Sequence, residues 1–354
     1  MKNKIYVEMH AFNAEDTIER AIDSILNQTY RNLELHVLDN ASTDGTLEII
    51  KRYAKEDNRV VAYHFPENHT VKWMNMVIRM LFTRLYREPA WYASLSADDE
   101  LDVTCFEKLM NFALENDLDI AACRSQFTGD VHGRVYNKNV GITENLIVEE
   151  KDFGEKFPEY WRYFRANWGH ITKIPYESEM GSADERVNVE YGGDNRFMLA
   201  MMNHANKMGV LNETLHTYYI HENALSMSYT SNRHKASYGL FANILDYFEK
   251  KVGYLSDRNE EFLFRQIYLR HLMNAFPIVC DAMIPTEKKL EELRFMLTND
   301  VTRQMLGKSF IPKEEKEECL KYAAEFMKVN GAAFEEFETI WDEILHVLKG
   351  VFHE

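Results

Sequence analysis

The first 127 residues alternate between short apolar runs and longer stretches in which apolar residues recur at helical spacing. The stretch between the first two runs shows this spacing clearly, with Ile18, Ala21, Ile22 and Ile25 on one side of a helix. The apolar runs predict strands at 5–9, 33–38, 60–65, 91–96 and 120–127. Strands that alternate with helices are typical of βαβ units. We therefore predict an α/β fold with a doubly wound, mostly parallel sheet.

The pattern changes twice along the chain. Residues 128–235 contain loops and short strands, then a helical or mixed segment at 184–208 and a strand at 214–220. We interpret them as the second half of the same domain. Residues 236–354 show helical stripes to the end, which predicts an all-helical C-terminal region.

Composition excludes several classes of protein. With 41 Lys and Arg against 57 Asp and Glu, the formal charge is −16, so nucleic acid is not an expected partner. The four cysteines lie far apart without a CxxC pair, which argues against a zinc site or a disulfide framework. No apolar segment has signal-peptide character or reaches the roughly 18 residues of a membrane span. We expect a cytoplasmic protein without a transmembrane segment, which could be peripheral to a membrane assembly.

Polar segments follow three of the predicted strands. Residues 10–13 follow the first strand, 39–46 follow the second and 96–100 follow the fourth. In an open parallel sheet the ligand binds at the carboxyl ends of the strands, where helix N-termini offer donors to anions. The sequence therefore predicts a binding site at this edge of the sheet.

At these segments the sequence resembles the inverting family 2 glycosyltransferases. Residues 11–13, 21–30 and 38–46 follow the opening pattern of that family almost position for position. The resemblance is strong over about residues 1–125 and weaker to about 230. It implies a GT-A-like nucleotide-sugar-binding fold. The implied activity is metal-dependent transfer of a sugar from a nucleotide diphosphate, most commonly a UDP-sugar, to an acceptor hydroxyl with inversion, in glycan biosynthesis.

The resemblance also assigns residues on the nucleotide side. Asp39 would accept hydrogen bonds from the base or ribose, with Ala11 and Asn13 nearby. Lys72 stands where the family has a basic residue that approaches the nucleotide. The alternatives are an aspartate that caps a turn and a lysine on a solvated helix surface.

Adjacent carboxylates suit a divalent cation, because Mg²⁺ and Mn²⁺ prefer oxygen ligands and also bind diphosphate. Asp98 and Asp99 resemble the acidic metal motif of the family, with Asp99 as direct ligand and Asp98 supporting it beside the nucleotide. Ser96 occupies the first acidic position of that motif, a departure that removes a ribose or nucleotide contact. His221 resembles a late motif that reaches the metal or diphosphate. A solvated acidic turn and a structural histidine are the alternatives.

An inverting transfer needs a base that takes the proton of the acceptor hydroxyl. Asp194 stands in a segment that looks like the base motif of the family, and a helix N-cap is its alternative role. Other carboxylates stand near it in the sequence: Asp184, Glu185 and Glu190. Trp168 falls where the family commonly builds its acceptor side, and an aromatic plane suits a sugar ring, although Trp168 could equally fill the core. Residues 128–235 would thus carry the acceptor side and the base.

Two rival functions belong to other classes. A non-catalytic nucleotide-sugar-binding or scaffold protein would keep Asp39 and perform no transfer. A sugar-1-phosphate nucleotidyltransferase would need a Gly-rich, Arg-containing loop after the first strand, which 10–15 lack. The acceptor could be a glycan, a lipid-linked molecule or a protein. The C-terminal helices could form a homo-oligomer, dock on an assembly or shape the acceptor site.

Overall fold

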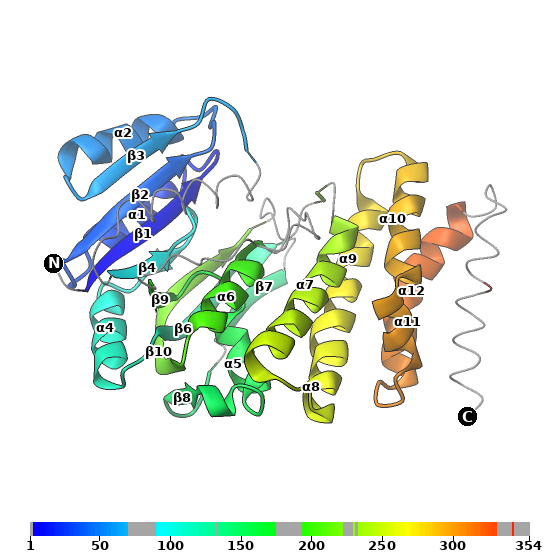
Figure 1. Cartoon of the computed structure of the whole chain (residues 1–354). Helices are drawn as coiled ribbons and strands as arrows, with labels where there is room; N and C mark the ends of the chain where they lie inside the picture. The colour runs from blue at the N-terminus through cyan, green and yellow to red at the C-terminus, as the bar shows by residue number, and fades with distance from the viewer. Residues whose placement is uncertain are drawn as a thin grey trace. The chain divides into compact units, whose positions relative to one another are not determined.

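A computed structural model describes eight segments of the chain: residues 3–69, 90–131, 134–139, 141–174, 193–221, 229–230, 233–330 and 342. The chain divides into two compact units. The first consists of residues 1–183 and 193–222, and the second of 184–192 and 223–354. The first unit holds the sheet and the second is helical (Figure 1).

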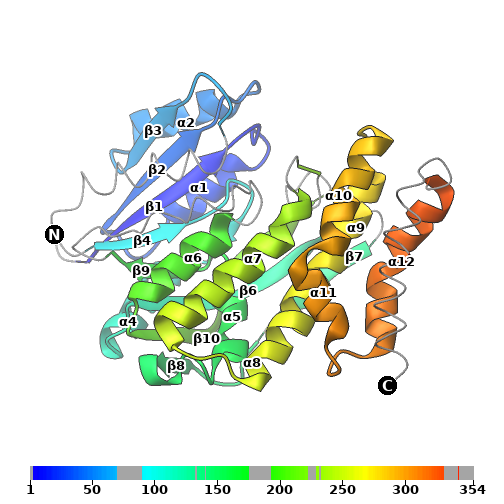
Figure 2. The same ribbon diagram turned by 45° about the vertical axis from the view of Figure 1, so that its right-hand side comes forward.

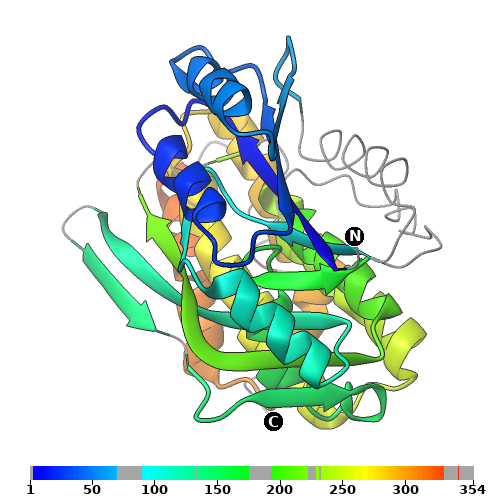
Figure 3. The same cartoon turned by 90° about the vertical axis from the view of Figure 1, so that its left-hand side faces the viewer.

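The sheet of the first unit has ten strands in the part of the chain that the structure describes. They are β1 (Lys4–Ala11), β2 (Leu33–Asp39), β3 (Val60–His64), β4 (Ala90–Ser94), β5 (Glu100–Leu101), β6 (Ile120–Val131), β7 (Arg134–Asn139), β8 (Leu146–Glu149), β9 (His170–Lys173) and β10 (Lys207–Ile220). Their order is β3-β2-β1-β4-β9-β6-β10-β5, with β7 beside β6 and β8 beside β10. Figure 3 shows β7 and the end of β6 as an antiparallel hairpin.

Parallel pairing dominates where the strands are longest. β1 pairs in parallel with β2 and β4, β2 with β3, and β6 with β10. β9 is antiparallel to both β4 and β6, so it joins the two parallel groups. The predicted α/β class with a mostly parallel sheet is confirmed, and so is the helical C-terminal region.

Residues 150–152 and 157–164 are helical, which corrects the expectation of loops and short strands in this region; Phe157, Tyr160, Trp161 and Phe164 recur at helical spacing and are buried. The first unit contains six helical segments in the described residues. They are α1 (Ile18–Leu26), α2 (Thr46–Glu56), α4 (Cys105–Glu115), the 3₁₀ turn η1 (Glu150–Asp152), α5 (Phe157–Phe164) and α6 (Gly193–His204). α6 begins inside the predicted mixed segment, but Lys207 and Met208 at the end of that segment belong to β10 instead. Residues 74–85 also show helical spacing of apolar residues in the sequence, which predicts a helix there, but they lie outside the described residues.

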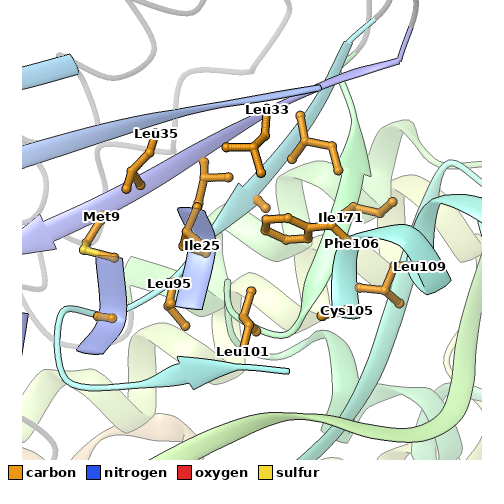
Figure 4. Packing of buried hydrophobic residues seen from close by; sticks show 14 of the residues in the cluster. Met9, Ile25, Leu33, Leu35, Leu95, Leu101, Cys105, Phe106, Leu109 and Ile171 are labelled. Atoms are coloured by element: carbon orange, nitrogen blue, oxygen red, sulfur yellow. The ribbon is translucent and has the colours of Figure 1, made fainter. Parts of the chain in front are cut away.

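Side chains of β1 alternate between the two faces of the sheet. Ile5, Val7 and Met9 belong to the main core together with Ile25 of α1 and Phe106 of α4. Figure 4 shows Met9, Ile25 and Phe106 in this core. The residues between them face the other side. Leu38 and Tyr92 are buried on that second face, where Tyr6 and Phe197 of α6 pack against them.

The second unit consists of helices in the described residues. They are α7 (Arg233–Tyr247), the π-helix η3 (Phe248–Val252), α8 (Asp257–Glu261), the π-helix η4 (Phe262–Leu269), α9 (Arg270–Asp281), α10 (Thr286–Thr298), α11 (Asp300–Gly307) and α12 (Lys313–Asn330). α9 contacts α7, α10 and α12 (Figure 2). Phe241 anchors this core, with its ring 4.7 Å from Phe264 and 5.4 Å from Tyr268. No helix in the described part of the chain is long and apolar enough to cross a membrane. The predicted stripe at 334–348 lies outside that part.

Candidate functional site

Asp39 ends β2 and is fully buried beneath the loop that leads to α2. Its carboxylate accepts a hydrogen bond from His64 Nδ1 at 2.8 Å and a longer one from the Ser42 backbone at 3.3 Å. The next residue, Asn40, donates its backbone N–H to the carbonyl of Ala11 at 2.9 Å. The ends of β1 and β2 therefore lie side by side, with the carboxylate of Asp39 fixed between loops.

Asn13 joins the loops that follow β1 and β2. Its Oδ1 accepts a hydrogen bond from the Thr43 backbone at 2.8 Å, and its own N–H donates to Ser42 Oγ at 2.9 Å. The backbone of Asn13 has φ 48°, a left-handed conformation that asparagine tolerates better than most residues. This accounts for an asparagine here in structural terms, and its nucleotide contact stays a prediction.

Asp99 is fully buried in the turn between β4 and β5. Its Oδ1 accepts a hydrogen bond from the Tyr219 backbone at 3.0 Å, and its Oδ2 lies 3.5 Å from His216 Nε2. Burial raises the pKa of the Asp99 carboxyl, and the nearby His216 imidazole opposes that rise. His216 is itself buried and contacts Ser125 Oγ through Nδ1 at 3.0 Å. Asp99 is thus held by β10, far away in the sequence.

Asp98 and His221 meet at the surface beside this buried pair. His221 Nε2 lies 2.8 Å from Asp98 Oδ2, and the two side chains are 43% and 36% exposed. Arg20 of α1 supports the turn, because its Nη2 donates to the Asp98 carbonyl at 2.6 Å. The same guanidinium lies 3.9 Å from the ring centroid of Tyr219. An accessible carboxylate and an imidazole therefore share one rigid corner.

This corner can hold part of a divalent metal site. In the described segments, no three His, Cys, Asp or Glu side chains form a complete metal cluster. Asp98 and His221 carry an oxygen and a nitrogen atom that can bind a cation, and the buried Asp99 Oδ2 has only the long 3.5 Å contact with His216 Nε2. A bound cation is one way to satisfy such an oxygen. The donor set fits a cation that takes its other ligands from phosphate oxygens.

Trp168 lies on an aromatic cluster next to the same corner. Its ring stacks on His216 at 4.8 Å with an interplanar angle of 20°. Phe127 and Tyr218 lie 6.0 and 5.6 Å from Trp168, and all three aromatic rings are partly exposed. Because His216 also faces Asp99, the predicted acceptor residue and the predicted metal residues are connected through one side chain.

Asp194 lies in the first turn of α6. Burial raises the pKa of its carboxyl, while the charges of His10 and Arg165 pull the pKa down and that of Glu8 pushes it further up. Phe197, three residues later, contacts the ring of Tyr92 at 5.0 Å. The predicted base is therefore on the second face of the sheet, near the end of β1.

Sequence reasoning missed several of these groups. Arg20 and His216 were not singled out, and Glu8 stood inside an apolar run with no motif around it. Each has partners distant in the sequence, so no local signal marks them. Other predicted or competing residues lie outside the described part of the chain: Lys72, Asp184, Glu185 and Glu190.

Comparison with known sequences now adds to this geometry. Residues 6–170 match the sequence model of Glycosyl transferase family 2. They are a family 2 glycosyltransferase domain. The glycosyltransferase YibD of Escherichia coli (strain K12) is 32% identical over 125 residues, 35% of this chain and 35% of YibD. The glycosyltransferase EpsJ of Bacillus subtilis (strain 168) is 24% identical over 221 residues, 61% of this chain and 60% of EpsJ. The chain thus spans less than two thirds of either relative.

A solved structure shows a similar fold over most of the chain. TarS 1–349 of S. aureus, crystallised in complex with UDP-GlcNAc, has a TM-score of 0.57 and covers 92% of this chain and 88% of its own. Its sequence identity is 16%, so the likeness concerns the fold. The family 2 domain of this chain therefore has the GT-A-like fold that the sequence predicts.

Proposed function

We propose that this chain is a glycosyltransferase that moves a sugar from a nucleotide diphosphate donor to an acceptor hydroxyl. The observation that carries the proposal is the Asp98–His221 pair, which lies at the carboxyl edge of a family 2 domain beside the buried Asp99. This is the edge at which α/β sheets bind ligands. A UDP-sugar is the proposed donor, supported by the UDP-GlcNAc bound to the TarS structure of similar fold.

Asp39 is proposed to hold the nucleoside. Its carboxylate accepts hydrogen bonds from His64 and Ser42, and an ionised carboxylate has about four acceptor positions in all. The remaining positions can accept from an imide N–H or a ribose hydroxyl. Ala11 and Asn13 line the adjoining loop, and Lys72 is proposed to approach the nucleotide.

Asp98, Asp99 and His221 are proposed to hold Mg²⁺ or Mn²⁺. When bound, such a cation neutralises negative charge on the departing nucleotide diphosphate. The chain itself fixes the geometry: Arg20 holds the Asp98 carbonyl, and Tyr219 fixes Asp99 through its backbone N–H.

Asp194 is proposed as the general base. It would take the proton of the acceptor hydroxyl as that oxygen forms a bond to the anomeric carbon, while the bond from this carbon to the diphosphate oxygen breaks on the opposite face. Inversion follows from this single displacement. A carboxylate whose pKa is raised by burial is a stronger proton acceptor than an exposed one, which suits this role.

Trp168 is proposed to contact the acceptor, together with Phe127 and Tyr218. Aromatic faces pack against the C–H faces of sugar rings. The cluster therefore favours an acceptor that presents a sugar ring, whether it is a glycan, a lipid-linked sugar or a glycosylated protein.

A donor screen tests the proposal. Purified protein is incubated with UDP-, GDP- and dTDP-sugars, with Mn²⁺, Mg²⁺ or a chelator, and release of the nucleotide is measured. We expect release from one donor class, dependent on the metal. Tight calorimetric binding of a nucleotide sugar, with no turnover on any donor or sugar acceptor, would instead identify a non-catalytic binding protein.

A further inference from the structure

We propose that His10, held in place by Glu8, is a positioning residue that keeps the carboxylate of Asp194 ionised. The three side chains would form a chain of carboxylate, imidazole and carboxylate from β1 to the first turn of α6. The inference rests on the proposed role of Asp194 as base, and it assigns two further residues to that reaction.

Glu8 is the first observation. It lies in the middle of β1 and is 3% exposed. Glutamate is almost never fully buried unless it is paired. Here one carboxylate oxygen accepts a hydrogen bond from the Tyr92 hydroxyl at 2.8 Å, and the other accepts from His10 Nε2. A buried acid with both oxygens engaged fixes the orientation of the imidazole.

The placement of α6 is the second observation. Glu8 and His10 are two residues apart on a strand, so both point to the second face of the sheet, away from the core under α1. Phe197 of α6 packs on Tyr92 of that face at 5.0 Å. Asp194 precedes Phe197 by three residues, and residues three apart share one side of a helix. The geometry therefore directs Asp194 toward the end of β1.

Charges around His10 leave it between two acids. On β2, Leu38 is paired with His10 in the register, and His36 is paired with Glu8. His36 contacts Glu34 at 3.0 Å, and burial lowers the pKa of His36, so it stays neutral near pH 7. On β4 the facing titratable group is Tyr92, whose pKa burial raises well above its usual value. The positive charge of Arg165, which follows α5, lowers the pKa of Asp194.

The electrostatic consequences agree in both directions. Burial alone would lower the pKa of His10, but the charge and hydrogen bond of Glu8, with a smaller effect of Asp194, raise it. The charge of His10 in turn lowers the pKa of Asp194, against burial. Such coupling is reciprocal by thermodynamic necessity. Protonated His10 thus limits how far burial can raise the pKa of the base.

Histidine titration by NMR tests the coupling without an assay of activity. The ring signals of histidine-labelled protein are followed with pH in the wild type, Glu8→Gln, Asp194→Asn and Asp23→Asn, and His10→Gln assigns the signal. Asp23→Asn is the matched control, because it removes an exposed carboxylate on α1. We expect the titration of His10 to move to lower pH in Glu8→Gln and Asp194→Asn only. Equal titrations in Asp194→Asn and Asp23→Asn would overturn the inference.

The pH dependence of kcat/KM gives the second readout. His10→Gln removes the positive charge that lowers the pKa of Asp194, so it should move the acidic limb of the profile to higher pH. At a pH below the pKa of the base, each unit of that shift lowers the ionised fraction about tenfold. His10→Lys restores a positive charge and should return the acidic limb to its wild-type pH. KM for the donor should be unchanged in both His10 variants. A purely structural role would lower the melting temperature of both variants and leave the limb in place.

The outcomes separate this inference from the proposed function. If Asp194→Asn retains full transfer activity, the assignment of the base fails. If Asp194→Asn is inactive while His10→Gln keeps the wild-type acidic limb, the base stands and the positioning role of His10 is wrong. If the wild type turns over no donor, the proposed function fails, and the NMR titration still decides whether His10 and Asp194 are coupled.

Discussion

His221 Nε2 lies 2.8 Å from Asp98 Oδ2, although 123 positions separate the two residues in the chain. The sheet topology creates this contact. β10 runs antiparallel to β5, with His216 opposite Leu101 and Thr217 opposite Glu100. The residues just beyond these pairs therefore meet at the turn after β4. A histidine that follows a strand by one residue thus becomes the neighbour of an aspartate from another part of the chain.

Removal of this pair should reduce metal-dependent turnover. Asp98→Ala and His221→Ala each delete one proposed ligand, and Asp99→Ala should abolish metal-dependent turnover. A Lewis acid supplies several kcal/mol of transition-state stabilisation, so we expect losses of roughly a hundredfold or more in kcat. Donor hydrolysis measured over a range of Mn²⁺ concentrations gives the comparison.

The matched control for these variants is Asp130→Ala, which removes an exposed carboxylate at the end of β6. It should keep the wild-type response to Mn²⁺. If Asp98→Ala and Asp130→Ala respond alike, Asp98 has no part in metal binding.

The core of the fold could be predicted because it depends on local patterns. The five apolar runs became β1, β2, β3, β4 and β6, and the stripe that begins at Ile18 became α1. The short strands were beyond reach, because β5, β8 and β9 form only against longer strands. β9, which joins the two parallel groups, buries the polar residues His170 and Thr172 on either side of Ile171, so its sequence contains no apolar run.

The residues of the candidate site also fall into those that the sequence marks and those that only the structure shows. Asp39, Asp98 and Asp99 follow predicted strands, so their position marks them as candidates, and the family resemblance supplies their predicted roles. Glu8 was missed because a single carboxylate inside an apolar run carries no sequence signal of its own. Only the structure shows that Tyr92 and His10 bind its two oxygens. Arg20 sits in the polar part of an amphipathic helix, and only the packing shows that it reaches the Asp98 carbonyl.

Gly129 should be intolerant of a side chain. Its φ of 153° is one that other residues rarely adopt, and a Cβ atom there would lie 2.1 Å from the carbonyl oxygen of Ile220. Gly129→Ala must push β6 away from the end of β10, next to His221. Overpacking of this kind costs about 1 to 3 kcal/mol. We expect a lower melting temperature and a weaker response to Mn²⁺, seen by differential scanning fluorimetry and donor hydrolysis.

Gly307→Ala is the companion variant, because a Cβ atom at Gly307 would meet nothing within 4 Å. It should leave both measurements unchanged. Equal melting temperatures for the two alanine variants would contradict the account of Gly129.

Trp168 should affect the acceptor more than the donor. Trp168→Ala removes the ring that stacks on His216 and borders Phe127 and Tyr218. Aromatic contacts are worth about 0.5 to 1.5 kcal/mol beyond the area they bury. We therefore expect KM for a sugar acceptor to rise roughly tenfold, with hydrolysis of the donor nearly unchanged, and Trp168→Phe to recover part of the loss. A rise in KM for the donor alone would place the ring on the other substrate.

His170 should make the fold sensitive to acid. It is buried in β9, and burial lowers the pKa of its imidazole to about 4, against a weak opposing contact with the Trp168 carbonyl. In the unfolded chain histidine titrates near 6.5. Between these values the unfolded chain binds a proton that the folded one rejects, so the free energy of unfolding falls as pH falls from about 6.5 to about 4. Each pH unit is worth about 1.4 kcal/mol, so the difference of about 2.5 units between the two pKa values sets a loss of about 3.5 kcal/mol as the upper bound.

Urea denaturation of the wild type and His170→Leu across this pH range measures the effect. Leucine cannot take up a proton, so the variant should lose less free energy of unfolding on acidification than the wild type does. His204→Leu, at an exposed position near the end of α6, is the matched control and should keep the wild-type slope. Parallel slopes for the wild type and His170→Leu would show that His170 is protonated inside the folded protein, with a carboxylate or carbonyl oxygen stabilising its charge.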